Sequence, residues 1–277
     1  MRLAVFSDIH GNISAFEAAL KDLETLGGAD YTWFLGDLAA FGSRPAACIQ
    51  RVKAIWDAAQ PPKPPEGSEP PPFPHTPPKV RAIRGNTDRY LVNGSRPKST
   101  PAENADDYAK RIQTIQDRDA NLNWALTQLA FEDYDFLRKL GGECDLHAKD
   151  YGDIIGYHAV PGDDEGDLTP ESTDEEAADF LLDREGRAGI GGHIHKQMDR
   201  TLSLGGWRVI NVGSVGLSFD MPGYAQWGLF TVEKGALDVD LRAVAYDVEA
   251  YIRDLETCGL PAPAWFVSKL RPTDTQS

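Results

Sequence analysis

Short apolar runs alternate with segments of helical periodicity over the first 84 residues of the chain. Residues 3–7 form a brief apolar run that predicts a buried strand. Apolar residues then recur at helical spacing from Ile13 to Leu26, and Gly27 with Gly28 ends the predicted helix. Further strands are expected at residues 31–35 and 80–84, with a helix from about 45 to 59. This alternation predicts an α/β layered fold.

Strand signals lie closer together in the second half of the chain. The pattern predicts strands at residues 154–158, 187–192, 207–212, 227–232 and 237–244. Several follow one another as in hairpins, so we expect the second half to form a sheet of its own. Two sheets placed face to face with helices outside would make a four-layer α/β/β/α sandwich of two mixed sheets. We expect residues 1–277 to form a single domain.

Three segments depart from this alternation. Residues 61–78 are rich in proline, which removes backbone donors and resists helix formation. We interpret them as a surface insertion in which His75 is solvated; the alternative is a ligand for a proline-recognising domain. Residues from about 101 to 140 predict two helices that form a cap-like insertion over one end of a sheet. Residues 163–185 are acidic and indicate a solvated face, with a helix in their later part.

Charge and cysteine content narrow the classes of function. The formal net charge is −15, and a surface this acidic repels nucleic-acid phosphates, which basic proteins neutralise. Cys48, Cys144 and Cys258 include no closely spaced pair, which suits a reducing compartment. The N-terminal apolar run is too short for a signal peptide, and no run approaches the roughly 20 residues of a membrane span. We therefore expect a cytoplasmic protein without a membrane or nucleic-acid partner.

Five short polar segments follow predicted strands or adjoin glycines. They are Asp8-Ile9-His10, Gly36-Asp37, Gly85-Asn86-Thr87-Asp88, Tyr157-His158 and Gly192-His193-Ile194-His195. Their Asp, Asn and His side chains form a mixed oxygen and nitrogen set of the kind that binds divalent first-row metals. In extended backbone, residues i and i+2 point to the same side, so each Asp-x-His or His-x-His pair can aim two ligands at one spot. Adjacent glycines let the backbone turn sharply and approach a bound group closely.

Each of these segments alone has an ordinary structural explanation. A histidine at a strand end, such as His158, is more often a hydrogen-bonded structural residue than a metal ligand. The Gly-His-x-His segment is a stronger signal, and the five segments in this order are far more specific than any one of them. Open α/β sheets collect ligands at the carboxyl ends of their strands. The sequence therefore predicts a metal centre at those ends.

The order of the five segments resembles that of the calcineurin-like metallophosphoesterases. Within that superfamily the chain is most similar to bacterial phosphoesterases related to diadenosine tetraphosphatase and to small bacterial phosphodiesterases. Further matches are Phe41-Gly42 with Pro45, His158-Ala159-Val160-Pro161, residues 211–216 and Tyr246-Asp247. The resemblance covers nearly the whole chain except the proline-rich insertion.

The resemblance implies a centre of two metal ions that share one carboxylate. One ion would be held by Asp8, His10, Asp37 and His195, and the other by Asp37, Asn86, His158 and His193. Manganese or iron is expected, and zinc, nickel or cobalt also suit these ligands. Two cations about 3.5–4 Å apart would hold the phosphate and activate a bridging hydroxide for in-line attack on phosphorus.

Thr87 departs from the pattern of the family. Many members carry histidine here, where it stabilises the transition state or protonates the leaving group. Threonine is not an acid near neutral pH, so the leaving-group step has no assigned residue, and we expect slow turnover of esters with poor leaving groups. Some small bacterial members also lack this histidine, so its loss does not imply inactivity.

Other residues near the predicted centre have more than one interpretation. Asn12 could donate to a substrate phosphate or cap the helix that follows it. Arg89 could bind phosphate as a bidentate fork or form a surface ion pair. Asp88 is expected to orient a metal-ligating histidine. We assign catalytic roles to Asp37, Asn86 and Asp88, and possible substrate-binding roles to Asn12 and Arg89.

The sequence thus predicts a metallophosphoesterase that hydrolyses a phosphodiester or a phosphomonoester, such as a small nucleotide. A non-catalytic scaffold of the same fold is one alternative, which Thr87 and the proline-rich segment leave open and which the complete ligand set opposes. A protein phosphatase is a second alternative. A nuclease is disfavoured because the chain is acidic and lacks a basic, aromatic-rich patch. The expected partner is a small phosphate ester, and the oligomeric state is left open.

Overall fold

The computed structural model describes residues 1–60, 77–98 and 100–271, and their strands form two five-stranded sheets. The first sheet has the strand order β10-β9-β1-β2-β3, and the second has the order β4-β5-β6-β8-β7. The strands of the first sheet are β1 (Arg2–Phe6), β2 (Tyr31–Phe34), β3 (Val80–Ala82), β9 (Tyr224–Glu233) and β10 (Ala236–Ala245). Those of the second are β4 (Glu143–Ala148), β5 (Gly152–Tyr157), β6 (Ala188–Gly191), β7 (Gln197–Thr201) and β8 (Arg208–Val212). Each sheet mixes parallel and antiparallel neighbours.

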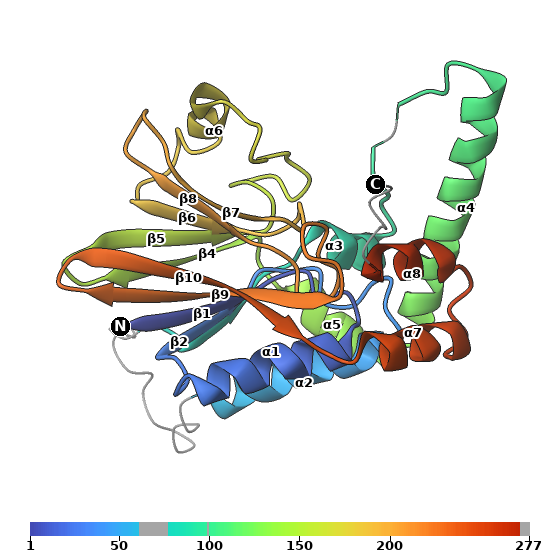
Figure 1. Cartoon of the computed structure of the whole chain (residues 1–277), viewed down its shortest axis with the longest axis horizontal. Helices are drawn as coiled ribbons and strands as arrows, with labels where there is room; N and C mark the ends of the chain where they lie inside the picture. The colour runs from blue at the N-terminus through green and yellow to red at the C-terminus, as the bar shows by residue number, and fades with distance from the viewer. Residues whose placement is uncertain (61–76, 99, 272–277) are drawn as a thin grey trace, which may run out of the picture.

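The two sheets lie face to face with helices on their outer sides (Figure 1). Helices α1 (Ile13–Thr25) and α2 (Pro45–Ala58) cover the first sheet, and α6 (Asp174–Asp179) lies over the second. The predicted four-layer α/β/β/α sandwich is therefore confirmed. The remaining helices gather toward the end of the molecule at which β1 finishes. They are α3 (Asn86–Asn93), α4 (Ala105–Thr127), α5 (Phe131–Lys139), α7 (Val248–Thr257) and α8 (Ala264–Leu270).

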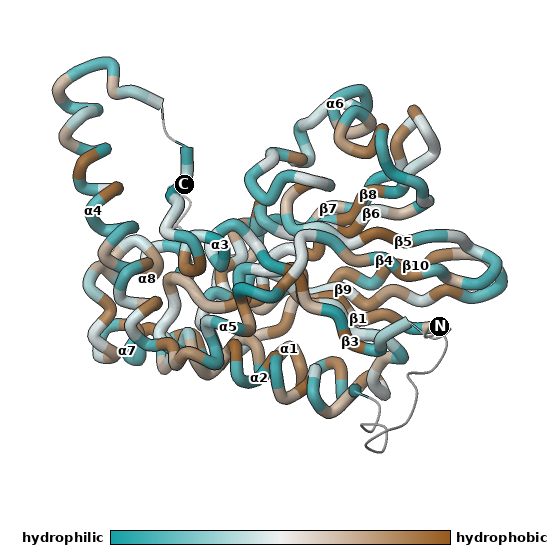
Figure 2. The backbone as a smooth tube through the Cα atoms, turned by 180° about the vertical axis from the view of Figure 1, so that it is seen from behind, coloured by the Kyte–Doolittle hydropathy of each residue, from teal (hydrophilic) through white to brown (hydrophobic). Residues whose placement is uncertain are grey.

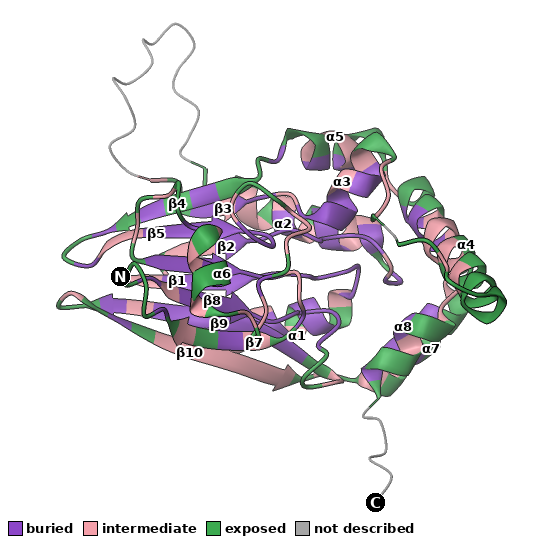
Figure 3. Ribbon diagram, turned by 90° about the horizontal axis from the view of Figure 1, so that it is seen from above, coloured by how far each residue is buried: buried purple, intermediate pink, exposed green. Residues whose placement is uncertain are grey.

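Alternate residues of β1 pack on opposite sides of the first sheet. Leu3 and Val5 belong to the cluster between the sheets, which also contains Ile154 of β5. Phe6 points the other way and packs edge-on against Phe16 of α1, with ring centroids 6.1 Å apart. This alternation is what a strand covered on both faces requires, which explains why β1 reads as a continuous apolar run. Buried residues accordingly follow the strands in Figure 3, and hydrophobic residues follow the strands and covering helices in Figure 2.

The second half of the chain does form a sheet, from β4 to β8, but the last two predicted strands, β9 and β10, belong to the first sheet. Strands β9 and β10 pair with each other, but β9 also runs antiparallel to β1, with Arg2 opposite Thr231 and Val5 opposite Gly228. Hairpin spacing indicates pairing only between strands that are close in sequence. Because β1 and β9 lie near opposite ends of the chain, their pairing could not be predicted from spacing. Most residues of β9 are buried, whichever face of the sheet they point to. This suits a strand that has a neighbouring strand on each side.

The two helices expected between residues 101 and 140 are α4 and α5. Leu122 and Ala125 of α4 and Leu137 of α5 are buried in the cluster that lies beneath the first sheet. The first turns of α4 are exposed and stand away from the rest of the molecule (Figures 1 and 3). The two helices therefore extend the helical layer, and a cap-like role for them stays a prediction.

Several elements differ from the sequence prediction. The edge strands β4 and β7 and the helices α7 and α8 were not predicted, and α6 is a single short helix within the acidic segment. Edge strands are short and half-exposed, so they carry a weak apolar signal. The proline-rich insertion lies almost wholly outside the described residues, and its interpretation stays a prediction. Among the described helices, none is both long and apolar enough to cross a membrane.

Candidate metal centre

All seven predicted ligands lie at one end of the two sheets, six of them on loops and Asn86 at the start of α3. They are Asp8 and His10 after β1, Asp37 after β2, Asn86 after β3, His158 after β5, and His193 and His195 after β6. Strands β1, β2 and β3 are parallel to one another, as are β5 and β6, so each set ends at a single edge. Because the sheets pack face to face, the two edges open on the same space.

Backbone hydrogen bonds fix these loops to one another. The Asp8 N–H donates to the Gly36 carbonyl at 3.0 Å, and the His10 N–H donates to the Asp37 carbonyl at 2.8 Å. Loops of the two sheets are also joined, since the His193 N–H donates to Asp8 Oδ2 at 2.8 Å. The loops are thus held in place by the protein chain itself.

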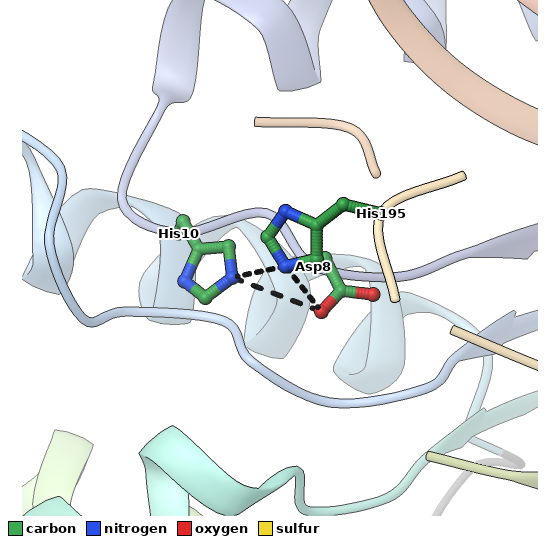
Figure 4. Close-up of side chains that lie close together, drawn as sticks. All are labelled: Asp8, His10 and His195. Atoms are coloured by element: carbon green, nitrogen blue, oxygen red, sulfur yellow. Dashed lines mark hydrogen bonds and ion pairs between the residues drawn. The ribbon is translucent and has the colours of Figure 1, made fainter. Parts of the chain in front are cut away.

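Asp8, His10 and His195 form the first cluster of the site (Figure 4). The Nε2 atoms of the two histidines lie 3.1 Å apart. Asp8 Oδ1 lies 3.2 Å from His195 Nε2 and 3.7 Å from His10 Nε2. All three side chains are almost fully buried, and three potential ligand atoms therefore converge on one point.

The second cluster is centred on His158 and Asn86. Asn86 Oδ1 lies 2.9 Å from His158 Nε2 and 3.2 Å from His193 Nδ1. Asp37 Oδ2 connects the clusters, since it lies 3.5 Å from His158 Nε2 and 3.6 Å from His10 Nε2. Asp8, Asp37 and His158 also bring their ligand atoms within 4.8 Å of one another, so Asp8 approaches the second cluster as well.

Three of the histidines are oriented through their Nδ1 atoms. His10 Nδ1 lies 3.1 Å from the Ala40 carbonyl, and His158 Nδ1 lies 2.7 Å from the Leu35 carbonyl. His195 Nδ1 lies 2.6 Å from another carbonyl, in the loop after β8. A carbonyl accepts only, so each Nδ1 carries a proton, and each Nε2 faces the site, where it can bind a cation once the imidazole is neutral. This arrangement is typical of metal-binding histidines.

The backbone of the site is strained at most of the ligand positions. Asp8, His10, Asp37, His193 and His195 all have positive φ values, between 48° and 72°. Residues other than glycine avoid this left-handed region, and each such residue costs about 1–3 kcal/mol. The hydrogen bonds that join the loops hold this conformation, which turns the ligand side chains toward the centre.

Two glycines allow the loops to approach the ligand side chains closely. A Cβ atom on Gly85 would lie 2.2 Å from Asp37 Oδ1 and 2.8 Å from His158 Cε1. A Cβ atom on Gly192 would lie 2.5 Å from Asp8 Oδ2. Both positions therefore require glycine for steric reasons, as the sequence pattern suggested.

Attraction between the buried charges outweighs burial at the carboxylates. Burial raises the pKa of Asp37, but the charge of His158 outweighs it and lowers that pKa to about 2. Burial also raises the pKa of Asp8, but the charge of His195 outweighs it and holds that pKa well below its usual value. Burial lowers the pKa of His158, but the charge of Asp37 raises it to about 10. Burial alone dominates at His193 and lowers its pKa. Two ionised carboxylates thus lie inside the protein, and a cation that binds there displaces the His158 proton.

The chemistry of these side chains fits divalent cations. Asp8 Oδ1 is buried and has no hydrogen-bond partner among the described residues. The Nε2 atoms of His10 and His195 face each other, and Asn86 Oδ1 faces Nε2 of His158. A buried acceptor without a donor is costly, and a bound cation would satisfy Asp8 Oδ1.

The structure favours the structural alternatives for Asn12 and Arg89. Asn12 Oδ1 accepts from the Ala15 N–H and caps α1, while its Nδ2 donates to the Gly216 carbonyl and the Tyr246 hydroxyl. Its donors are therefore already used within the protein. Arg89 forms a bidentate ion pair with the Asp164 carboxylate, with two N–O distances of 2.8 Å, rather than offering a free fork.

Asp88 acts on a neighbouring backbone rather than on a histidine. Its carboxylate accepts from the N–H groups of Asp37 at 2.7 Å, Leu38 at 3.0 Å and Gly85 at 3.2 Å. Burial, together with the charge of Asp37, raises the pKa of Asp88 to about 7. The expected contact to a ligating histidine is replaced by a clamp that joins the Asp37 loop to the start of α3. The Thr87 hydroxyl is buried and has no hydrogen-bond partner among the described residues.

Sequence reasoning missed two residues that contact the predicted ligands. The Tyr90 hydroxyl accepts from Asn86 Nδ2 at 3.2 Å and also contacts the Glu165 carboxylate. This contact turns the Asn86 oxygen toward the histidines. The spacing of four residues on α3 could have indicated it. Phe219 stacks on the His195 ring with centroids 4.6 Å apart, and no local pattern marks that long-range contact.

A model of the calcineurin-like phosphoesterase family matches residues 1–197, which is most of the chain. The chain belongs to this family, whose members are metal-dependent phosphoesterases, and the predicted resemblance is confirmed. No curated protein sequence matches the chain.

Two solved structures share the fold over almost their full length. A metallophosphoesterase from Sphaerobacter thermophilus is 21% identical, with 98% of each chain covered and a TM-score of 0.65. A hypothetical protein from Pyrococcus horikoshii is 20% identical, with 97% of each chain covered and a TM-score of 0.72. At these identities the likeness shows the fold, and the chemistry has to be argued from the site.

Proposed function

We propose that this protein is a dinuclear metal-dependent hydrolase that cleaves a small phosphodiester or phosphomonoester. The observation that carries the proposal is the position of Asp37 Oδ2, which lies within 3.6 Å of a histidine from each of the two clusters. A carboxylate in that position can bind two cations at once. Family membership supports phosphate-ester hydrolysis as the use of such a centre.

In this proposal the ligands fall into two sets that share Asp37. Asp8, His10, Asp37 and His195 would hold one ion, and Asp37, Asn86, His158 and His193 would hold the other. The pair of ions supplies charge neutralisation for the phosphate and lowers the pKa of a water molecule. Manganese or iron is proposed for both positions, because imidazole and carboxylate ligands suit these metals and cellular supply selects among them.

The protein residues contribute orientation and electrostatics. The carbonyls that bind the Nδ1 atoms hold the imidazole rings, and the Asp88 clamp holds the backbone of Asp37. Pre-formed geometry of this kind is where catalytic sites gain most of their rate. The Thr87 hydroxyl is not an acid near neutral pH, so esters with good leaving groups should react fastest.

The proposed substrate is a small phosphate ester, and the proposed location is the cytoplasm. All three cysteines are free thiols, which supports a reducing compartment. A net charge of −15 disfavours a nucleic-acid substrate, whose phosphates would be repelled. A non-catalytic scaffold of the same fold remains the alternative that the following experiment separates.

Hydrolysis that depends on added metal tests the proposal. Protein stripped with a chelator should not hydrolyse bis(p-nitrophenyl) phosphate or p-nitrophenyl phosphate, and added Mn²⁺ should restore release of p-nitrophenol. Fe²⁺, Co²⁺, Ni²⁺ and Zn²⁺ should be tested in parallel, with bound metal counted in each sample. If none of the five ions restores turnover of either ester while two ions are bound, the protein is a scaffold.

A further inference from the structure

A cavity of about 340 Å³ opens beside the metal centre on the side of His158. Its walls come from the turn between β3 and α3, the segment before β4, and the loop after β5. The charged and histidine residues that line it are Arg84, Arg89, Glu143, His158, Asp163 and Asp164. Because His158 belongs to both the cavity wall and the metal centre, a molecule held at the centre can extend into this cavity.

Most charged groups of the cavity already have partners within the protein. Arg89 is paired with Asp164 through two hydrogen bonds of 2.8 Å. Glu143 accepts from the Arg184 guanidinium at 2.7 and 3.0 Å, and this contact lowers the pKa of Glu143. Asp163 Oδ1 accepts from the backbone N–H two residues later, at 2.9 Å. These groups are occupied by structural contacts.

Arg84 is the exception among these charged groups. Within the described part of the chain, its guanidinium makes no hydrogen bond and no ion pair, although it lines the cavity and is only partly exposed. Its backbone is fixed, because the Arg84 N–H donates to the Gly141 carbonyl at 2.8 Å. A guanidinium presents five donors in a planar fork that matches phosphate and carboxylate oxygens. An unpaired fork in a cavity beside a phosphate-binding centre is suited to a second anion.

We propose that Arg84 binds a second anionic group, a phosphate or a carboxylate, of the ester that is hydrolysed at the metal centre. The proposal rests on the proposed function, and it narrows the substrate class to esters that carry a further anion beyond the scissile phosphate. Nucleotides with more than one phosphate belong to this class. The acidic residues of the cavity repel an anion, so the Arg84 charge is what would make this cavity accept one.

Binding of simple phosphates tests this assignment without requiring turnover. Protein loaded with Mn²⁺ and freed of excess metal is titrated calorimetrically with inorganic phosphate, pyrophosphate and tripolyphosphate, which differ in the distance between anionic groups. We expect the wild type to bind pyrophosphate or tripolyphosphate more tightly than phosphate. Arg84→Gln should bind pyrophosphate and tripolyphosphate about tenfold or more weakly than the wild type, which is the effect of losing a charged hydrogen bond. Its affinity for phosphate should stay unchanged.

Lys234→Gln is the matched control for net charge. Lys234 lies in the turn between β9 and β10, and its side chain is 88% exposed and remote from the strand ends that carry the centre. It should bind all three anions like the wild type. If Arg84→Gln does not fold, Arg84→Met, which keeps an unbranched stem, provides the same comparison. A polyphosphate preference that survives without Arg84, or an equal loss of affinity for all three anions, would overturn the proposal.

Failure of this proposal is distinguishable from failure of the proposed function. If the protein hydrolyses bis(p-nitrophenyl) phosphate but its polyphosphate binding is unchanged in Arg84→Gln, only the anion subsite is overturned. Polyphosphate binding that depends on Arg84 in a protein that hydrolyses no ester supports the subsite and overturns catalysis.

Discussion

Asp37 is the residue at which the two clusters of the centre meet. Its Oδ2 faces one histidine of each cluster, and its Oδ1 accepts from the Thr87 N–H at 2.9 Å. Its backbone has a φ of 55°, and Asp88 holds its N–H. One side chain is therefore fixed at both carboxylate oxygens and at its backbone, as a shared ligand requires.

Replacement of this carboxylate is the most direct test at the residue scale. Asp37→Asn removes one negative charge from the space between the clusters, so we expect both metal ions to bind more weakly together. Turnover of bis(p-nitrophenyl) phosphate should fall by at least about a hundredfold, as for loss of a principal electrostatic group. Metal content measured by mass spectrometry and initial rates provide the two readouts.

A surface carboxylate provides the control for this change. Asp199→Asn removes an equal charge from a surface ion pair with Arg208, and it should leave turnover and metal content unchanged. Wild-type activity in Asp37→Asn at matched metal content would exclude the shared-ligand role.

At the scale of elements, the turn from β3 into α3 decides whether the second cluster can form. The turn passes through Gly85 and places Asn86 at the first position of α3. Asp88, in the first turn of that helix, binds back to the Gly85 N–H and to the loop after β2. Helix and strand loop are thereby locked together at a distance that excludes a side chain at position 85.

Gly85→Ala should therefore disrupt the site while leaving most of the fold intact. The added methyl group would meet Asp37 Oδ1 at 2.2 Å, so the loop after β2 must shift. We expect stability to fall by about 1–3 kcal/mol, as in overpacked cores, and activity to fall by about a hundredfold. Urea unfolding and initial rates measure the two effects.

Gly141→Ala, in the segment between α5 and β4 whose carbonyl accepts from the Arg84 N–H, serves as the matched control. Its added Cβ would have its nearest neighbour at 3.9 Å, an ordinary contact, so both stability and rate should stay near the wild-type values. Equal behaviour of the two variants would show that close packing at Gly85 does not position the ligands.

At the scale of the whole molecule, the centre lies between two sheets that also meet through an apolar cluster and through hydrogen bonds such as that from the Arg208 guanidinium to the Leu237 carbonyl. Ligands from the first sheet and from the second converge on the same ions in the proposed arrangement. Unfolding separates them, so bound metal must stabilise the folded state by mass action.

Metal removal should therefore lower thermal stability. At a free Mn²⁺ concentration about a hundredfold above the dissociation constant, stabilisation is about 2.7 kcal/mol per site, and each occupied site should raise the unfolding midpoint of a chain this size by about 5 °C. Differential scanning calorimetry with Mn²⁺ and with chelator measures this shift. We expect Asp37→Asn to show a much smaller shift, and identical midpoints for the wild type in both conditions would contradict metal binding across the sheets.

The alternation of strands and helices made much of the fold predictable from the chain alone. Strand β1 was predicted from its apolar run, and helix α1 from the helical spacing of its apolar residues and the glycines that follow it. Both signals exist because each element buries apolar side chains in a regular pattern. The second sheet was predicted incompletely, since the partner of β1 is β9, and pairing between opposite ends of the chain leaves no local pattern. Local pattern likewise could not choose between the alternatives for Asn12 and Arg89, because their partners Tyr246 and Asp164 are distant in sequence.

The sequence by itself determined which side chains could bind metal, because donor chemistry belongs to each residue and strand ends are marked by local pattern. Only the tertiary structure decided that Asp37 faces both clusters, that Asp88 holds a backbone rather than a histidine, and that the Arg84 side chain has no partner among the described residues. Those are distances between segments far apart along the chain, and they are set by the packing of the two sheets rather than by any local preference.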